Sequence, residues 1–277
     1  MTLVSKRLHH PSATKKGRVE MEHQTFKYRD YDVPVHLANM TGGGPENFGE
    51  IALHHQSLIH HWIDIRPSDR VFEVGCGIGR DAIPLAETLT TGVYQGIDLI
   101  RPSIDWLNEN VASKYANFSF HHLDIEDDLH HPTGKMRVED VRLPAGARSV
   151  DKIFLFSVFT HMYRNEIGHY LKEFNRILAP GGKVFATCFF VDDAILAKAR
   201  ETNLTQWDLR FEHEIEPGCY INNPESPRGA TAFTKGAIEA ANASSGLKIV
   251  NSLNGTWSGY HEHCDDGQDV IILQKPQ

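Results

Sequence analysis

The chain has 277 residues, of which 28 are Lys or Arg and 36 are Asp or Glu, giving a formal net charge of −8. Hydrophobic residues make up 40 %, a normal share for a globular protein that can bury a core. Because a general nucleic-acid binder needs a basic face, this acidic balance predicts no nucleic-acid partner.

The charge is unevenly distributed along the chain. Residues 1–18 carry +5 and no acid, which leaves −13 for the remainder. We expect residues 1–44 to form a basic, partly disordered arm and an entry loop. The alternative interpretation is that the basic arm binds an anionic partner by electrostatic attraction.

The spacing of the cysteines and the distribution of apolar residues predict the cellular compartment of the protein. Cys76, Cys188, Cys219 and Cys264 form no C-x-x-C pair, which predicts reduced thiols and not a disulfide framework. No apolar leader opens the chain, and no segment approaches the ~20 apolar residues that a membrane helix needs. We therefore expect a cytoplasmic protein that does not span a membrane.

From about residue 69, short apolar runs alternate with helical stretches, which is typical of a parallel sheet covered by helices on both faces. The expected strands are 71–74, 93–97, 117–123, 152–158 and 183–190, with 247–253 and 270–274 as an antiparallel edge pair. The expected helices are 45–64, 81–90, 102–114, 165–178 and 234–245. The sequence thus predicts an α/β domain over 45–277 with a doubly wound, mostly parallel seven-stranded sheet and insertions at about 126–148 and 205–230.

A Gly-rich turn, E-V-G-C-G-I-G-R at residues 73–80, follows the first predicted strand. Its glycines let the backbone approach a ligand, and the helix behind them supplies free N–H groups. A dinucleotide fingerprint needs Gly or Ala where Arg80 stands, so the turn disfavours a nicotinamide-dependent oxidoreductase. Asp98, at the tip of the next strand, can accept both hydroxyl protons of a ribose.

These motifs resemble those of the class I S-adenosylmethionine-dependent methyltransferases. The run at 73–79 is similar to the first motif of that family, Asp98 to its ribose-binding acid, and 151–158 to its fourth motif. The run R-I-L-A-P-G-G-K at 176–183 is similar to the family's turn before the fifth strand, and the whole resemblance covers about 50–275. The short runs Y-Q-G-I-D, F-S-V-F-T-H-M and W-S-G resemble a bacterial subgroup that acts on small molecules or glycans.

The resemblance implies S-adenosylmethionine as the cofactor and a role for each matching residue. Glu73 would lie near the cofactor ammonium group, Asp98 would bind the ribose, and Asp124 would accept from the adenine amino group. The implied cofactor-binding residues are Glu73, Gly75, Gly77, Gly79, Asp98, Leu99, Asp124, Ile125 and Ser157. Leu99 and Ile125 would flank the adenine, and Ser157 would line the floor beside the methyl group.

Methyl transfer to a hydroxyl is faster when a base removes the hydroxyl proton, and such a base would lie near the end of the fourth strand. His161 lies just past that strand and is the candidate, the alternative being a helix-start histidine that contacts backbone or cofactor. His213, His261 and His263 are candidate substrate-binding residues, because their loops are expected to reach the same edge of the sheet. Each could instead be a solvent-exposed loop histidine. The paired histidines at 54/55, 60/61, 121/122 and 130/131 are interpreted as ordinary surface or core residues.

No metal site is predicted. The run H-E-H-C-D-D at 261–266 offers ligands but has no second cluster beside it, and 157–162 lacks the acids of catechol-type enzymes. The leading hypothesis is O-methylation of a small metabolite or sugar. The alternatives are N-methylation of a small amine and a non-catalytic cofactor-binding scaffold. The expected partners are a small-molecule or glycan acceptor, with no nucleic acid and no membrane, and homodimerisation stays open.

Overall fold

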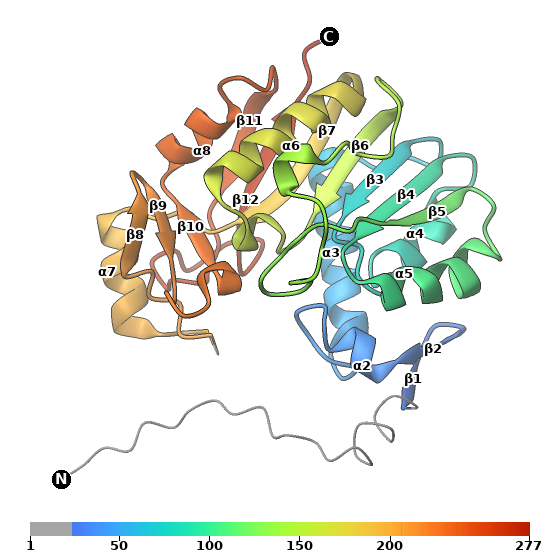
Figure 1. Ribbon diagram of the computed structural model, residues 1–277, viewed down its shortest axis with the longest axis horizontal. Helices are drawn as coiled ribbons and strands as arrows, with labels where there is room; N and C mark the ends of the chain where they lie inside the picture. Colours follow the sequence, from blue (N-terminus) through green and yellow to red (C-terminus); the bar gives the residue numbers. More distant parts are fainter. Residues whose placement is uncertain (1–23, 206) are drawn as a thin grey trace.

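Figure 1 shows a computed structural model of the protein, which describes residues 24–205 and 207–277. Its central seven-stranded sheet has the order β11-β12-β7-β6-β3-β4-β5. The strands are β3 (Arg70–Val74), β4 (Val93–Asp98), β5 (Phe118–His122), β6 (Val150–Leu155), β7 (Leu178–Cys188), β11 (Lys248–Leu253) and β12 (Asp269–Gln274). β12 pairs antiparallel with β7 and β11, whereas the other neighbours pair parallel. The predicted fold is therefore confirmed, with β12 as the reversed strand.

Helices cover both faces of this sheet (Figure 1). One face carries α3 (Phe48–Ile63), α4 (Ala82–Thr88) and α5 (Arg101–Leu107), which a π-helical turn, η1 (Asn108–Ala112), continues. The other face carries α6 (Arg164–Ile177) and α8 (Lys235–Asn242). Successive side chains of β6 point to opposite faces, so that Phe154 joins the first core and Leu155 the second. The central strands are consequently apolar on both sides, as a covered parallel sheet requires.

Parallel strands bring the functional motifs to one edge of the sheet. The carboxyl ends of β3, β4, β5 and β6 meet there, and this edge is where open α/β sheets bind ligands. The Gly-rich turn after β3, Asp98 in β4, and Asp124 and Ser157 just after β5 and β6 all lie at this edge.

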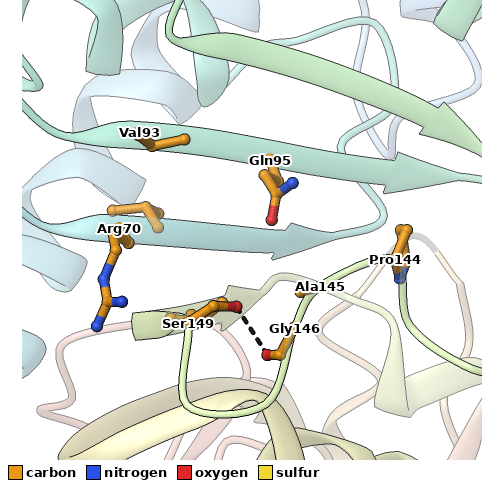
Figure 2. A pocket seen from close by; sticks show the side chains of 9 residues that line it. Arg70, Val93, Gln95, Pro144, Ala145, Gly146 and Ser149 are labelled. Atoms are coloured by element: carbon orange, nitrogen blue, oxygen red, sulfur yellow. Dashed lines mark hydrogen bonds between the residues drawn. The ribbon is translucent and has the colours of Figure 1, made fainter.

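The opposite edge holds a separate cavity of about 270 Å³ (Figure 2). It is lined by the first half of β3, by β4, by the start of β6 and by segment 144–149, including Arg70, Gln95 and Ser149. This cavity lies by the amino ends of the strands and is distinct from the edge that carries the Gly-rich turn.

Residues 25–38, within the segment expected to form an arm and an entry loop, contain regular structure. β1 (Thr25–Tyr28) and β2 (Tyr31–Pro34) make an antiparallel hairpin, and α2 (Val35–Ala38) follows directly. Alternate side chains of β2 point inward, so Tyr31 and Val33 are buried against the α3 side of the core. The basic arm predicted at the start of the chain falls largely outside the described residues.

The two segments expected as irregular insertions contain short elements. The first includes a 3-10 turn, η2 (Val138–Asp140). In and after the second, β8 (His213–Glu216), β9 (Cys219–Ile221) and β10 (Thr231–Phe233) form a three-stranded sheet, with η4 (Pro227–Gly229) between β9 and β10. The pattern does not predict α7 (Asp193–Thr202), whose Leu196 packs with Phe211 and Trp257 in a third apolar cluster. Among the described residues, no helix is both long and apolar enough to cross a membrane.

Candidate active site

The Gly-rich turn adopts a left-handed backbone that favours glycine. Gly75, Gly77 and Gly79 have φ values of 77°, 51° and 84°. A side chain at Gly75 would place its Cβ 2.7 Å from Cγ2 of Val158, which is closer than real contacts allow. The Gly75 N–H also donates to the Ile97 carbonyl at 2.8 Å, so the turn is joined to the end of β4.

The side chain of Asp98 is hydrogen-bonded to this turn. Its Oδ2 accepts from the Gly77 N–H at 2.7 Å, and its Oδ1 accepts from the Ile100 N–H at 2.8 Å. Burial raises the pKa of the Asp98 carboxyl, and these two backbone donors oppose that rise. The side chain is only half-buried, so the carboxylate is held in a fixed orientation while a ligand can still reach it.

Glu73 lies beneath the turn in a dry environment. It is 3 % exposed, and its carboxyl accepts a hydrogen bond from the hydroxyl of Tyr94. Burial, and then the nearby charge of Asp81, raise the pKa of Glu73 well above its usual range. The predicted contact with a cofactor ammonium group stays a prediction.

Asp124, at the end of β5, is already paired. Its Oδ1 accepts from Nε2 of His131 at 2.7 Å, and this hydrogen bond lowers the pKa of the Asp124 carboxyl. Ile125 is buried in the core, and Leu99 packs against the same cluster. The predicted adenine contacts of these three residues remain untested.

His122 completes a group of potential metal ligands with Asp124 and His131. One ligand atom from each lies within 4.8 Å of the others. However, Nε2 of His122 contacts the Leu99 carbonyl at 3.0 Å, and its Nδ1 accepts from the Arg101 guanidinium at 3.0 Å. A cation here would have to displace that guanidinium, so the group is a poor ligand set.

His161 ends a 3-10 turn, η3 (Phe159–His161), that follows β6. Its Nδ1–H donates to the Arg228 carbonyl at 2.7 Å. This bond sets the tautomer and leaves the lone pair on Nε2. Burial lowers the pKa of His161, so the ring is neutral near pH 7. The ring also stands edge-to-face with that of His130, at 5.6 Å between centroids.

Arg228 joins both insertion segments around His161. Its guanidinium donates to the two carboxylate oxygens of Glu166 on α6 at 2.8 and 2.6 Å, and it lies 3.9 Å from Asp127 in the first insertion. It also lies over the ring of Tyr163, at 4.5 Å from the centroid. His161 is therefore located where α6 and the two insertions meet.

Ser157, the first residue past the end of β6 that has a hydroxyl, has a strained backbone with φ of 56°. Its N–H donates to Oγ1 of Thr187 at 2.7 Å, and its Oγ accepts from Nε2 of Gln268 at 2.8 Å. Gln268 belongs to the loop between β11 and β12, so this loop reaches the carboxyl edge of the sheet.

The three predicted substrate histidines are scattered. His213 is exposed at the start of β8, whereas His261 and His263 lie on the β11–β12 loop. His261 contacts the ring of Tyr260 at 4.9 Å. Across residues 24–205 and 207–277, no hydrogen bond connects any of the three to His161, and their substrate roles remain predictions.

His55 and Asp81 form a buried contact next to the Gly-rich turn that the sequence pattern did not reveal. Nδ1 of His55 lies 3.0 Å from a carboxylate oxygen of Asp81, and its ring stacks on Phe156 at 3.5 Å. The two members of the pair are far apart in the sequence, and no spacing rule links the middle of a helix to the end of a Gly-rich turn.

Residues 71–182 match the methyltransferase domain family. This range runs from β3 into β7 and includes the Gly-rich turn, Asp98, Asp124, Ser157 and His161. The chain contains a class I methyltransferase domain. The predicted family and enzyme class are confirmed, and S-adenosylmethionine, the predicted cofactor, is the cofactor of that class. The oxidoreductase alternative is thereby set aside.

Solved structures share the fold of this methyltransferase domain. An S-adenosylmethionine-dependent methyltransferase from Methanosarcina mazei aligns with a TM-score of 0.52 and 18 % identity, over 79 % of this chain and 97 % of its own. The 1,6-didemethyltoxoflavin-N1-methyltransferase of Burkholderia thailandensis, solved with its acceptor and S-adenosylhomocysteine, also aligns with a TM-score of 0.52 and 18 % identity, over 84 % of this chain and 80 % of its own. At this identity the likeness shows the fold alone.

Curated relatives correct the prediction about nucleic acid. The 23S rRNA (uracil(1939)-C(5))-methyltransferase RlmD of Shewanella sediminis is 29 % identical over 115 residues, covering 39 % of this chain and 26 % of the relative. RlmD of Pectobacterium carotovorum is 28 % identical over 131 residues, covering 45 % and 26 %. This chain thus spans about a quarter of the length of these relatives.

The prediction of no nucleic-acid partner is therefore wrong, because proteins similar to part of this chain are named as methyltransferases of 23S rRNA. The physical reason is that the net charge of a chain does not report the charge of the local surface that meets an RNA.

Proposed function

We propose that this methyltransferase domain transfers a methyl group from S-adenosylmethionine to a hydroxyl of a small acceptor at the carboxyl edge of its sheet. The observation that supports the proposal best is the 2.7 Å hydrogen bond from the Gly77 N–H to Asp98. It joins the Gly-rich turn to the acid at the tip of β4, so that the two halves of a nucleoside-binding site form one rigid unit.

The residues at this edge fit the cofactor. The glycines keep the turn free of side chains, and Asp98 has lone pairs beyond the two that its backbone donors occupy. Glu73 is buried beneath the turn, and a ligand that carries ammonium and sulfonium charges nearby would favour its ionised form. When bound, S-adenosylmethionine supplies an electrophilic methyl group.

His161 is the proposed base. Its Nδ1–H is held by the Arg228 carbonyl, so Nε2 is the atom that can accept a proton from an acceptor hydroxyl. Its lowered pKa keeps Nε2 unprotonated near pH 7. Ser157, whose backbone and hydroxyl are both held by hydrogen bonds, would form a fixed floor beside the reacting atoms.

A second candidate acceptor is RNA. The observation that favours it is the similarity of the domain to RlmD proteins, whose names state methylation of a uracil in 23S rRNA. The basic side chains of residues 1–18 would attract phosphate groups to such a complex.

Isothermal titration of the protein with S-adenosylmethionine, S-adenosylhomocysteine and NAD tests the cofactor. We expect heat with the first two ligands and none with NAD, and no heat with the first two would contradict the proposal. Transfer of tritiated methyl groups then separates the acceptors. Label in small molecules extracted from cells supports the first candidate, whereas label in ribosomal RNA supports the second.

A further inference from the structure

We propose that His55 and Asp81 form a positioning pair that holds the Gly-rich turn in its cofactor-binding shape. The proposal rests on the proposed function, because the turn is taken as the cofactor site. His55 lies on α3 and Asp81 directly follows the turn, and neither belongs to the recognised motifs.

Asp81 occupies the N-cap position of α4 but does not cap it. Asp is favoured at this position because its side chain usually accepts from the N–H groups of its own helix. Here no such bond forms, and both carboxylate oxygens instead accept from Nδ1–H of His55, at 3.0 and 3.1 Å. Next to His55, Gln56 donates from Nε2 to the Asp81 carbonyl at 3.3 Å. Consecutive residues of α3 therefore hold the side chain and the backbone of the residue that ends the turn.

The imidazole of His55 is fixed on its flat face as well. It lies parallel to the ring of Phe156, with 3.5 Å between centroids and 4° between planes. Phe156 directly precedes Ser157 at the end of β6. The side chains of His55 and Asp81 are 11 % and 5 % exposed, so the pair is shielded from water. Three segments that are distant in sequence, namely α3, the turn and the end of β6, thus meet at one imidazole.

There is a physical reason why a positioning pair would help cofactor binding. The turn uses glycines with positive φ, and glycine loses more conformational freedom on ordering than any other residue. A turn that is already ordered in the free protein binds its ligand more tightly, because no further conformational entropy of the turn is lost when the ligand binds. A buried pair that anchors Asp81 would supply this order at the downstream end of the turn, while Asp98 supplies it at Gly77.

Two substitutions at His55 separate hydrogen bonding from packing. His55→Asn places an amide N–H close to the position of Nδ1, whereas His55→Phe keeps a flat ring against Phe156 and loses the donor. We expect His55→Phe to raise the Kd for S-adenosylhomocysteine about tenfold and His55→Asn about threefold or less, measured by isothermal titration. His61→Phe, at an exposed position of the same helix, is the matched control and leaves the Kd unchanged.

Hydrogen exchange on the ligand-free protein provides a second measurement that does not depend on cofactor binding. In His55→Phe, we expect the amides of residues 79–83 to exchange about tenfold faster than in the wild type, with the β7 amides unchanged. Should His55→Phe fail to fold, the double variant His55→Phe/Asp81→Leu removes the buried carboxylate that has lost its imidazole partner and keeps only Arg80, 3.9 Å away, and it is expected to show the same weak binding.

Wild-type affinity and wild-type exchange in a folded His55→Phe variant would overturn the positioning role. Equal losses in the Asn and Phe variants would do so too, because the donor would then not matter. If the wild type itself does not bind S-adenosylhomocysteine, the proposed function fails, while the exchange data still decide whether the pair orders the turn.

Discussion

Among single residues, Asp98 is the one on which cofactor binding depends most. Both of its oxygens are oriented by backbone N–H groups at 2.7 and 2.8 Å, so the carboxylate is preorganised for a ligand. We predict that Asp98→Ala weakens S-adenosylhomocysteine binding by about 2–3 kcal/mol through the loss of charged hydrogen bonds, as measured by isothermal titration. Asp105→Ala, at an exposed position of α5, is the control with unchanged affinity. Unchanged binding by Asp98→Ala would mean that this carboxylate does not hold the ribose.

The lowered pKa of His161 leads to a prediction about how the rate of methyl transfer depends on pH. Because burial lowers its pKa below the usual 6.5, Nε2 is a free base at higher pH and is protonated only as pH falls through the lowered value. With a hydroxyl acceptor, we expect the rate of methyl transfer to rise with pH through a pKa below 6.5 and then level off. His161→Ala should lose this acidic limb and about 10²–10⁴ of kcat, measured in a pH–rate series. Full turnover by the variant would assign the proton to another acceptor.

Among the elements, β12 is connected to neighbouring segments by hydrogen bonds to the buried carboxyl of Asp269. Asp269, 1 % exposed, accepts from the N–H groups of Phe190 and Gly255 at 2.7 Å each and from Nε1 of Trp257 at 2.8 Å. Burial nevertheless raises the pKa of Asp269 to about 6. Since the folded state favours the protonated form, the stability that Asp269 contributes at low pH is lost as pH rises through about 6.

Asp269→Asn removes this titration. We predict that the free energy of unfolding of the wild type, measured relative to the variant by urea denaturation, falls by about 2 kcal/mol between pH 4 and pH 7. Parallel pH dependences of the two proteins would contradict the raised pKa of Asp269. The comparison with the variant is needed because Asp127, Asp151 and Glu173, whose pKa values are lowered, change stability in the opposite direction.

The sequence pattern identified the long elements and missed the short ones. β3, β4 and β5 could be predicted because buried strands have continuous apolar runs, and α6 because an amphipathic helix has an apolar period. β8, β9 and β10 have three or four residues each, too few for a period to emerge among Pro and Gly, and tertiary burial decides their conformation. β7 starts at Leu178 and includes the A-P-G-G run at 179–182 expected as a turn, because pairing with β6 extends the strand.

In the molecule as a whole, the N-terminal hairpin is part of the fold and covers the α3 side of the core. Tyr31 is 6 % exposed and packs edge-to-face on Trp106, and the ammonium group of Lys114 lies 4.0 Å from its ring centroid. We predict that Tyr31→Ala lowers the free energy of unfolding by about 3 kcal/mol, measured by denaturant titration, because it removes a buried aromatic ring. Leu53→Ala, at a position 68 % exposed, should change it by about 0.5 kcal/mol or less. Similar values for the two variants would show that the hairpin is not stably docked.

The sheet, the Gly-rich turn and the place of Asp98 at a strand tip could be predicted, because they depend on local apolar runs and on residue types at fixed spacing within one β–turn–α–β segment. The surroundings of the histidines could not be predicted in this way, because they depend on contacts between distant segments. His161 acquires its tautomer from the Arg228 carbonyl, and His55 acquires its partner Asp81 from the docking of α3. A histidine's role is set by what its two ring nitrogens meet, and those partners come from segments that only the folded chain brings together.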